Sequence, residues 1–94
     1  MTDPLYEGSS ELDQQIRVSL QAIYLLVDKC IPNLTPAQTK VMEERLEASL
    51  DECRFFQKKG NKERVLYELR DIGNWLVQFI TDAEKKFWKD QDNP

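Results

Sequence analysis

The sequence contains no histidine among its 94 residues. Histidine is the side chain that most often acts as a general base near neutral pH, and it is also the commonest metal ligand. The three glycines form no glycine-rich phosphate loop, and no nucleophile elbow or zinc motif is present. A di-iron carboxylate site needs Glu-x-x-His pairs, which cannot occur here. We therefore predict that the chain is not an enzyme and uses no cofactor and no metal.

Cysteines and long apolar runs are also scarce. Cys30 and Cys53 are the only cysteines, too few for a disulfide framework, and both are predicted to be small buried hydrophobic residues. The longest apolar run, residues 22–27, is far too short to cross a bilayer. The segment "MTDPLYEGSS" lacks the basic region and apolar core of a secretory signal. These absences predict a cytoplasmic protein with no membrane partner.

The charge balance favours a protein partner over nucleic acid. Thirteen basic and 17 acidic residues give a net charge of −4, which repels nucleic acid at long range. Glu43 and Glu47 lie on one side of a predicted helix, where they either form a solvated face or receive a basic partner. Basic residues concentrate only around the turn after residue 59. A phosphate-binding tip is the less favoured interpretation of that group, which contains Arg54, Lys58, Lys59, Lys62 and Arg64.

Apolar residues recur at alternating steps of four and three in three segments, which is the period of amphipathic helices. We predict helices over residues 11–30, 36–59 and 62–89. An irregular arm would precede them at residues 1–9, and a frayed tail would follow at 90–94. The apolar stripes are Ile16, Leu20, Ile23, Val27 and Cys30; Met42, Leu46, Ser49, Cys53 and Phe56; and Val65, Leu69, Ile72, Leu76, Phe79, Ala83 and Phe87.

Residues at the segment ends support these boundaries. Ser10 is a favourable N-cap, and Thr35 with Pro36 and Gln38 forms a capping-box start for the second helix. Gly60 suits a left-handed turn, and Asn61 can cap the third helix immediately after it. Short connections between helices predict an all-α, antiparallel (up-down-up) three-helix bundle in one domain, residues 1–94, with a long C-terminal helix. That helix would overhang its neighbours unless the N-terminal arm covered the excess.

The predicted first helix carries a second apolar face behind its stripe, formed by Val18, Ala22 and Leu25. Either the N-terminal arm covers this face, or it meets a partner or a second copy of the chain. Leu66, Gly73 and Val77 would flank the stripe of the third helix, with Gly73 allowing close approach of a neighbour.

The segment "RDIGNWLVQFITDAEKKFW" carries more aromatic surface than one stripe needs. Tyr67, Asp71 and Trp75 are predicted to point away from that stripe, either flat against the bundle or in an interface. Trp88 would cap the end of the bundle or serve as another anchor. By elimination, the sequence predicts an acidic protein-binding module of the inhibitor, immunity or adaptor type. A structural homodimer is the alternative, and nucleic-acid binding is less favoured.

Overall fold

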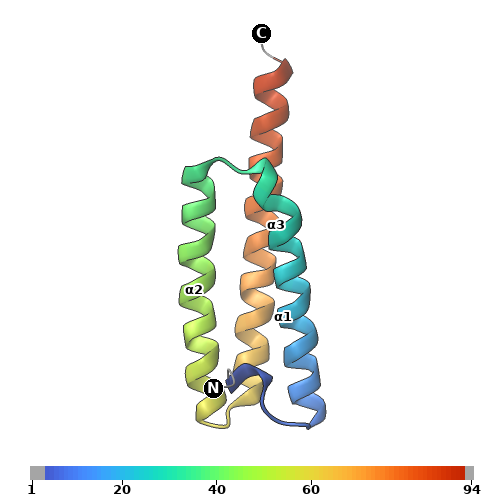
Figure 1. Cartoon of the computed structure of the whole chain (residues 1–94), viewed down its shortest axis with the longest axis vertical. Coiled ribbons are helices and arrows are strands. Elements are labelled where there is room, and N and C mark those ends of the chain that lie inside the picture. The colour runs from blue at the N-terminus through green and yellow to red at the C-terminus, as the bar shows by residue number, and fades with distance from the viewer. Residues whose placement is uncertain (1–3, 93–94) are drawn as a thin grey trace.

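The chain folds as three α-helices in a computed structural model that describes the backbone of residues 4–92 and the side chains of residues 4–85. They are α1 (Glu11–Cys30), α2 (Pro36–Lys58) and α3 (Lys62–Asp92), and two short 3-10 turns, η1 (Pro4–Tyr6) and η2 (Ile31–Asn33), complete the elements (Figure 1). No strand occurs in the described range, so the prediction of an all-α fold is confirmed. The predicted tail is helical as far as residue 92, and the predicted irregular arm contains the turn η1.

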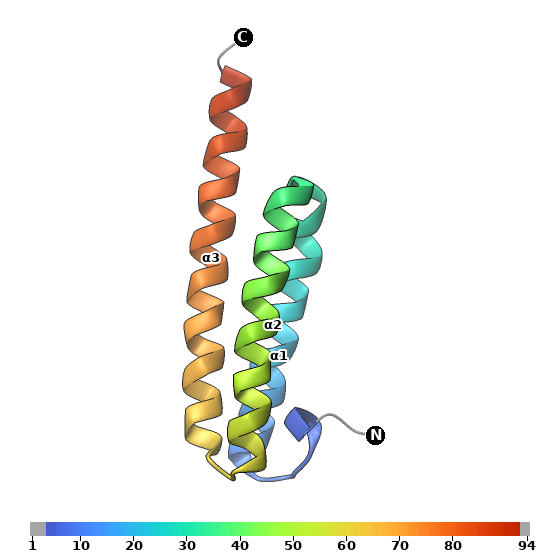
Figure 2. The ribbon, with the colours of Figure 1, turned by 90° about the vertical axis from the view of Figure 1, so that its left-hand side faces the viewer.

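The three helices lie alongside one another, and the chain reverses direction at each connection (Figure 1). α3 packs against both α1 and α2, whereas α1 and α2 approach each other much less closely. The turn η1 contacts both α1 and α2 near the end of the molecule where α3 begins (Figure 2). The molecule is elongated as a result, with extents of 53 × 21 × 20 Å.

Side-chain caps fix the start of two helices, as the sequence indicates. Ser10 and Asp13 form a capping box at α1, and Thr35 and Gln38 form one at α2. In the second box the Gln38 N–H donates to Thr35 Oγ1 (3.1 Å) and the Thr35 N–H donates to Gln38 Oε1 (2.9 Å). Gly60 has a φ of 78°, which confirms the predicted left-handed turn between α2 and α3.

The core lies along the seams where the helices face α3. The predicted stripes of α1 and α2 are buried apart from Phe56, which is half-buried, and Leu50 joins them. On α3 the stripe is buried up to Leu76, but beyond it Ile80 is buried while Phe79 is only half-buried. The prediction missed one core member outside the helices, Leu5 of η1, whose side chain is 1% exposed.

The C-terminal part of α3 extends past the ends of both other helices, as Figures 1 and 2 show. The prediction left open whether the N-terminal arm covers this overhang. It does not, because the arm lies at the opposite end of the molecule. The side chains of Phe87 and Trp88 fall outside the described residues.

Candidate protein-binding surfaces

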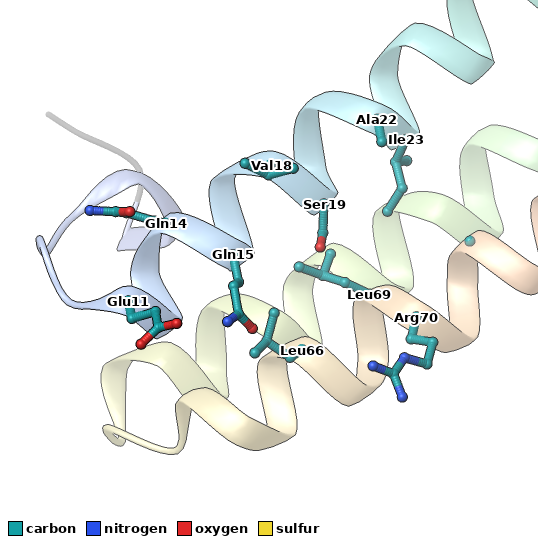
Figure 3. A pocket seen from close by; sticks show the side chains of 11 residues that line it. Glu11, Gln14, Gln15, Val18, Ser19, Ala22, Ile23, Leu66, Leu69 and Arg70 are labelled. Carbon is teal, nitrogen blue, oxygen red and sulfur yellow. The ribbon is translucent and has the colours of Figure 1, made fainter.

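A groove of about 640 Å³ runs between α1 and α3 (Figure 3). Ile23 and Leu69, both core residues, contribute apolar side chains to its lining. Figure 3 shows Gln15 of α1 pointing toward Leu66 of α3, so polar side chains share the groove with apolar ones. We call this surface the α1–α3 groove, and its lining includes Gln15, Val18, Ser19, Ala22, Leu66, Arg70 and Gly73.

Two of the predicted binding residues, Val18 and Ala22, lie in the α1–α3 groove. Val18 is 67% exposed, so the N-terminal arm does not cover it. Gly73 was expected to permit close approach of a neighbour, and this expectation is wrong. A Cβ atom at Gly73 would meet nothing within 4 Å, so the missing side chain leaves open space in the groove.

Leu25, the third residue of the predicted face, lies in a different hollow. This hollow of about 340 Å³ is bounded by Tyr6 of the arm and by a stripe of α1 that includes Arg17, Tyr24 and Asp28. Leu25 is 58% exposed despite its position beside the arm. The structure therefore divides the predicted face of α1 between two hollows.

Tyr67, Asp71 and Trp75 lie on the side of α3 that meets α2. The Arg45 guanidinium of α2 lies 5.8 Å from the centre of the Trp75 ring and 3.9 Å from an Asp71 carboxylate oxygen. Trp75 also stacks on Phe79, with ring centres 4.9 Å apart. Of the two alternatives left open for Trp75, the structure matches packing against the bundle, because its half-buried ring lies against the core cluster.

Tyr67 differs from Trp75 in that its side chain is largely open to solvent. It is 61% exposed, and the Arg64 guanidinium lies 5.0 Å from its ring centre. The same guanidinium lies 5.4 Å from the Phe56 ring of α2. Arginine and aromatic side chains therefore lie next to one another on this surface, and both kinds of residue are enriched at protein interfaces. We call the surface the α2–α3 face, and it is formed by Arg45, Phe56, Arg64, Tyr67, Asp71 and Trp75.

Glu43 and Glu47 are exposed on α2, which both alternatives left open for them require. Farther along the same helix, Asp51 is already occupied by an ion pair with Arg54 at 3.0 Å. The basic residues near the α2–α3 turn are engaged in a similar way. Arg64 pairs with Glu68 at 3.2 Å, and the Lys59 ammonium lies over the Phe55 ring. Much of the positive charge at this turn is therefore matched within the chain.

We did not predict the buried polar node at the N-terminus of α1, which is formed by Asp13 with Ser10, Gln57 and Lys62. The Asp13 carboxylate is 1% exposed and accepts hydrogen bonds from the Lys62 ammonium (2.7 Å), the Gln57 amide (3.2 Å), and the Ser10 hydroxyl (2.6 Å). These bonds, that from Lys62 above all, hold the pKa of Asp13 well below its usual range. One signal was available: Asp13 lies three residues before Ile16, on the buried stripe itself.

The two cysteines are buried and unpaired, as predicted. Burial raises the pKa of the Cys53 thiol to about 12, and the nearby carboxylates of Glu68 and Glu52 act in the same direction. Burial is also the main reason that the pKa of Cys30 is raised. A thiolate is the reactive form of cysteine, so neither side chain is poised for chemistry near neutral pH.

Among the described residues, no group of three or more histidine, cysteine, aspartate or glutamate side chains is arranged to hold a metal ion. Within the same part of the chain, no helix combines the length and apolar character needed to cross a membrane. Comparisons with protein-family models, with characterised proteins and with solved structures found no match to this chain.

Proposed function

We propose that this chain is a protein-binding module, an up-down-up helical bundle that occludes a surface of a protein partner without catalysing a reaction. The α1–α3 groove is the observation that carries the proposal. It is open to solvent, Ile23 and Leu69 provide apolar lining, and Val18 on α1 is 67% exposed. Exposed apolar surface gathered at one place on a small protein commonly marks an interaction site.

The α2–α3 face supplies a second contact region in this proposal. Tyrosine, tryptophan and arginine are the residues that most often dominate binding energy at interfaces. Tyr67 is the member best placed to insert into a partner, since Trp75 already packs on Phe79. Glu43 and Glu47 would contribute mainly to the rate of association if the partner is basic, and substitution of both by lysine should slow association less at high salt.

Val18→Glu tests the groove, and Val41→Glu provides a matched control. Val41 is also a valine on a helix, is 50% exposed, and lies on α2, outside the groove. Proteins captured by the wild-type chain from its source cells would be identified and then titrated with both variants. We expect Val18→Glu to weaken binding at least tenfold, about 1.4 kcal/mol, and Val41→Glu to have little effect.

Circular dichroism should show that both variants melt close to the wild-type temperature, because both positions are exposed. Equal binding by Val18→Glu and Val41→Glu would contradict the assignment of the groove. Tyr67→Ala is the corresponding test of the α2–α3 face. Trp75→Ala is less suitable, because loss of its stack on Phe79 would also affect stability.

A structural homodimer is the second candidate, and the overhang of α3 favours it (Figure 2). Leu25 and Val77, which are 58% and 55% exposed, would be buried in part by a second copy. Sedimentation at micromolar concentration separates the candidates, because an obligate dimer does not run as a monomer. Leu25→Glu should weaken the dimer if this face is used. Binding of a random oligonucleotide at low salt, with steep salt dependence, would instead favour the nucleic-acid alternative.

A further inference from the structure

The N-terminal arm, defined here as residues 4–10, lies against α1 and α2 at the end of the molecule where α3 begins (Figures 1 and 2). Its turn η1 contacts both helices, and the Leu5 side chain belongs to the hydrophobic core. α1 and α2 make few contacts with each other, so the arm contributes part of the packing between them. A leucine outside the three helices therefore completes the core that they share.

Most of the arm lies on the surface of the molecule. Leu5 is its only buried side chain, while Tyr6 and residues 7–10 are exposed. The Gly8 carbonyl accepts a hydrogen bond from the Arg17 guanidinium at 2.7 Å. The Ser10 N–H and hydroxyl donate to Asp13 at 3.1 and 2.6 Å. Leu5 is thus the buried apolar side chain of a segment that is otherwise largely exposed.

The ends of the helices are joined without the arm. Asp13 of α1 pairs with Lys62 of α3 at 2.7 Å and accepts from Gln57 of α2 at 3.2 Å. Opening of the arm at Gly8 would leave both contacts in place, because none of the atoms involved belongs to residues 4–10. α1, α2 and α3 also keep their internal backbone hydrogen bonds, so opening of the arm does not require the helices to unfold.

Gly8 marks the position where the arm turns over the Asp13 carboxylate. Its φ of 96° favours glycine, and a Cβ atom at this position would overlap the carboxylate. The docked arm therefore needs glycine here on two counts, backbone conformation and space. Substitution of Gly8 perturbs the docked state of the arm without altering any residue of the core.

We propose that the N-terminal arm is a strap that opens near Gly8 while the three helices remain folded, and that this opening uncovers the seam between α1 and α2. Local opening of weakly held segments, at a free-energy cost below that of global unfolding, is common in proteins. Withdrawal of Leu5 would expose the core cluster to which its side chain belongs in the closed molecule. Access to this seam is then controlled by the strap, whether or not the α1–α3 groove binds a partner.

Native-state proteolysis of the full chain with chymotrypsin tests the strap. Cleavage after Leu5 or Tyr6 requires the arm to open, whereas cleavage after Phe55 or Phe56 requires α2 to unfold. At urea concentrations below the unfolding transition, we expect arm cleavage to be at least tenfold faster than α2 cleavage. Its rate should also depend much less on urea, because opening exposes little surface compared with global unfolding.

Gly8→Ala and Gly60→Ala form a matched pair for the same assay. Gly60 also has a positive φ, of 78°, but a Cβ atom there would meet nothing within 4 Å. Both variants introduce backbone strain, and only Gly8→Ala also displaces the arm from Asp13. We expect Gly8→Ala to accelerate arm cleavage at least tenfold relative to Gly60→Ala, with both variants retaining the helical signal in circular dichroism.

Two results would overturn the proposal. Arm and α2 cleavage with the same dependence on urea would show that the arm opens only when the whole chain unfolds. Equal arm cleavage in Gly8→Ala and Gly60→Ala would show that the contact over Asp13 does not hold the arm. The proposal holds only if arm cleavage depends less on urea than α2 cleavage does and if Gly8→Ala accelerates arm cleavage more than Gly60→Ala does.

Discussion

Replacement of Leu5 by alanine measures how much the N-terminal arm stabilises the helices. The substitution removes three carbon atoms from a side chain that is 1% exposed. At about 0.8 kcal/mol for each buried carbon, the lost transfer free energy is about 2.4 kcal/mol. A rigid core that keeps the cavity open raises the cost of a leucine-to-alanine change to as much as about 5 kcal/mol.

The geometry of the arm favours the lower part of this range. Leu5 lies on a short segment whose other side chains are largely exposed, so the arm can shift to close the cavity or leave altogether. The loss of stability then cannot exceed the free energy that docks the arm. We expect a decrease of about 2–3 kcal/mol in the free energy of unfolding. For a chain of this length, that loss corresponds to a fall in Tm of roughly 10–20 °C.

Urea unfolding followed by circular dichroism measures this change, with Leu25→Ala as the control. Leu25 is also a leucine but is 58% exposed, so its replacement should cost less than about 0.5 kcal/mol. A loss below about 0.5 kcal/mol for Leu5→Ala would show that Leu5 does not complete the core. A loss above about 4 kcal/mol would show that the arm stays docked over a rigid cavity, which contradicts the reasoning from weak attachment.

Three further predictions concern the core, the polar node and a cysteine. Leu76→Ala should reduce the free energy of unfolding by about 2–5 kcal/mol, whereas Val77→Ala on the exposed side of α3 should change it little; similar urea midpoints would refute the assignment of the core. Because the pKa of Asp13 is lower in the folded chain than in the unfolded chain, its ion pair with Lys62 contributes fully to stability above about pH 5. This stabilisation is lost progressively as the pH falls below the pKa of Asp13 in the unfolded chain, about 3.9. Asp13→Asn should therefore lose less stability than the wild type between about pH 5 and 2, and parallel stability curves would contradict the role of the ion pair. Because the pKa of Cys53 is raised to about 12, a thiol reagent at pH 8 should label Cys53 no faster than the chain unfolds, and rapid labelling of the folded chain would refute its burial.

The helices were predictable from the sequence because their signals are local. The period of the apolar residues, the N-cap at Ser10, the capping box at Thr35 and the glycine at position 60 are each signals within a few neighbouring residues. Helix ends were less certain, and α3 continues three residues beyond its predicted end at 89. The C-terminal sequence "KDQDNP" contains no apolar residue that would have extended the periodic pattern.

Features that depend on rotation of one helix about another were not predictable in the same way. An ideal helical wheel puts Trp75 off the stripe of α3, but the neighbouring Arg45 and Phe79 side chains enclose its ring. Val18, Ala22 and Leu25 share a face on the wheel, yet the positions of α3 and the arm divide them between two hollows. Leu5 follows a proline in a short turn and shows no periodicity, so only the folded arrangement reveals that it is buried.

The node at Asp13 joins parts of the chain that are far apart in sequence, and this has a consequence for the order of folding. Its contacts with Gln57 and Lys62 span 44 and 49 residues, whereas the α2–α3 turn joins neighbouring segments. Closing a long loop costs more entropy than closing a short one, so α2 and α3 are expected to associate before the node forms. Interactions that form after the transition state affect the unfolding rate more than the folding rate. The ion pair at Asp13 would then chiefly slow unfolding. Its removal should shorten the lifetime of the folded chain while leaving its refolding rate nearly unchanged.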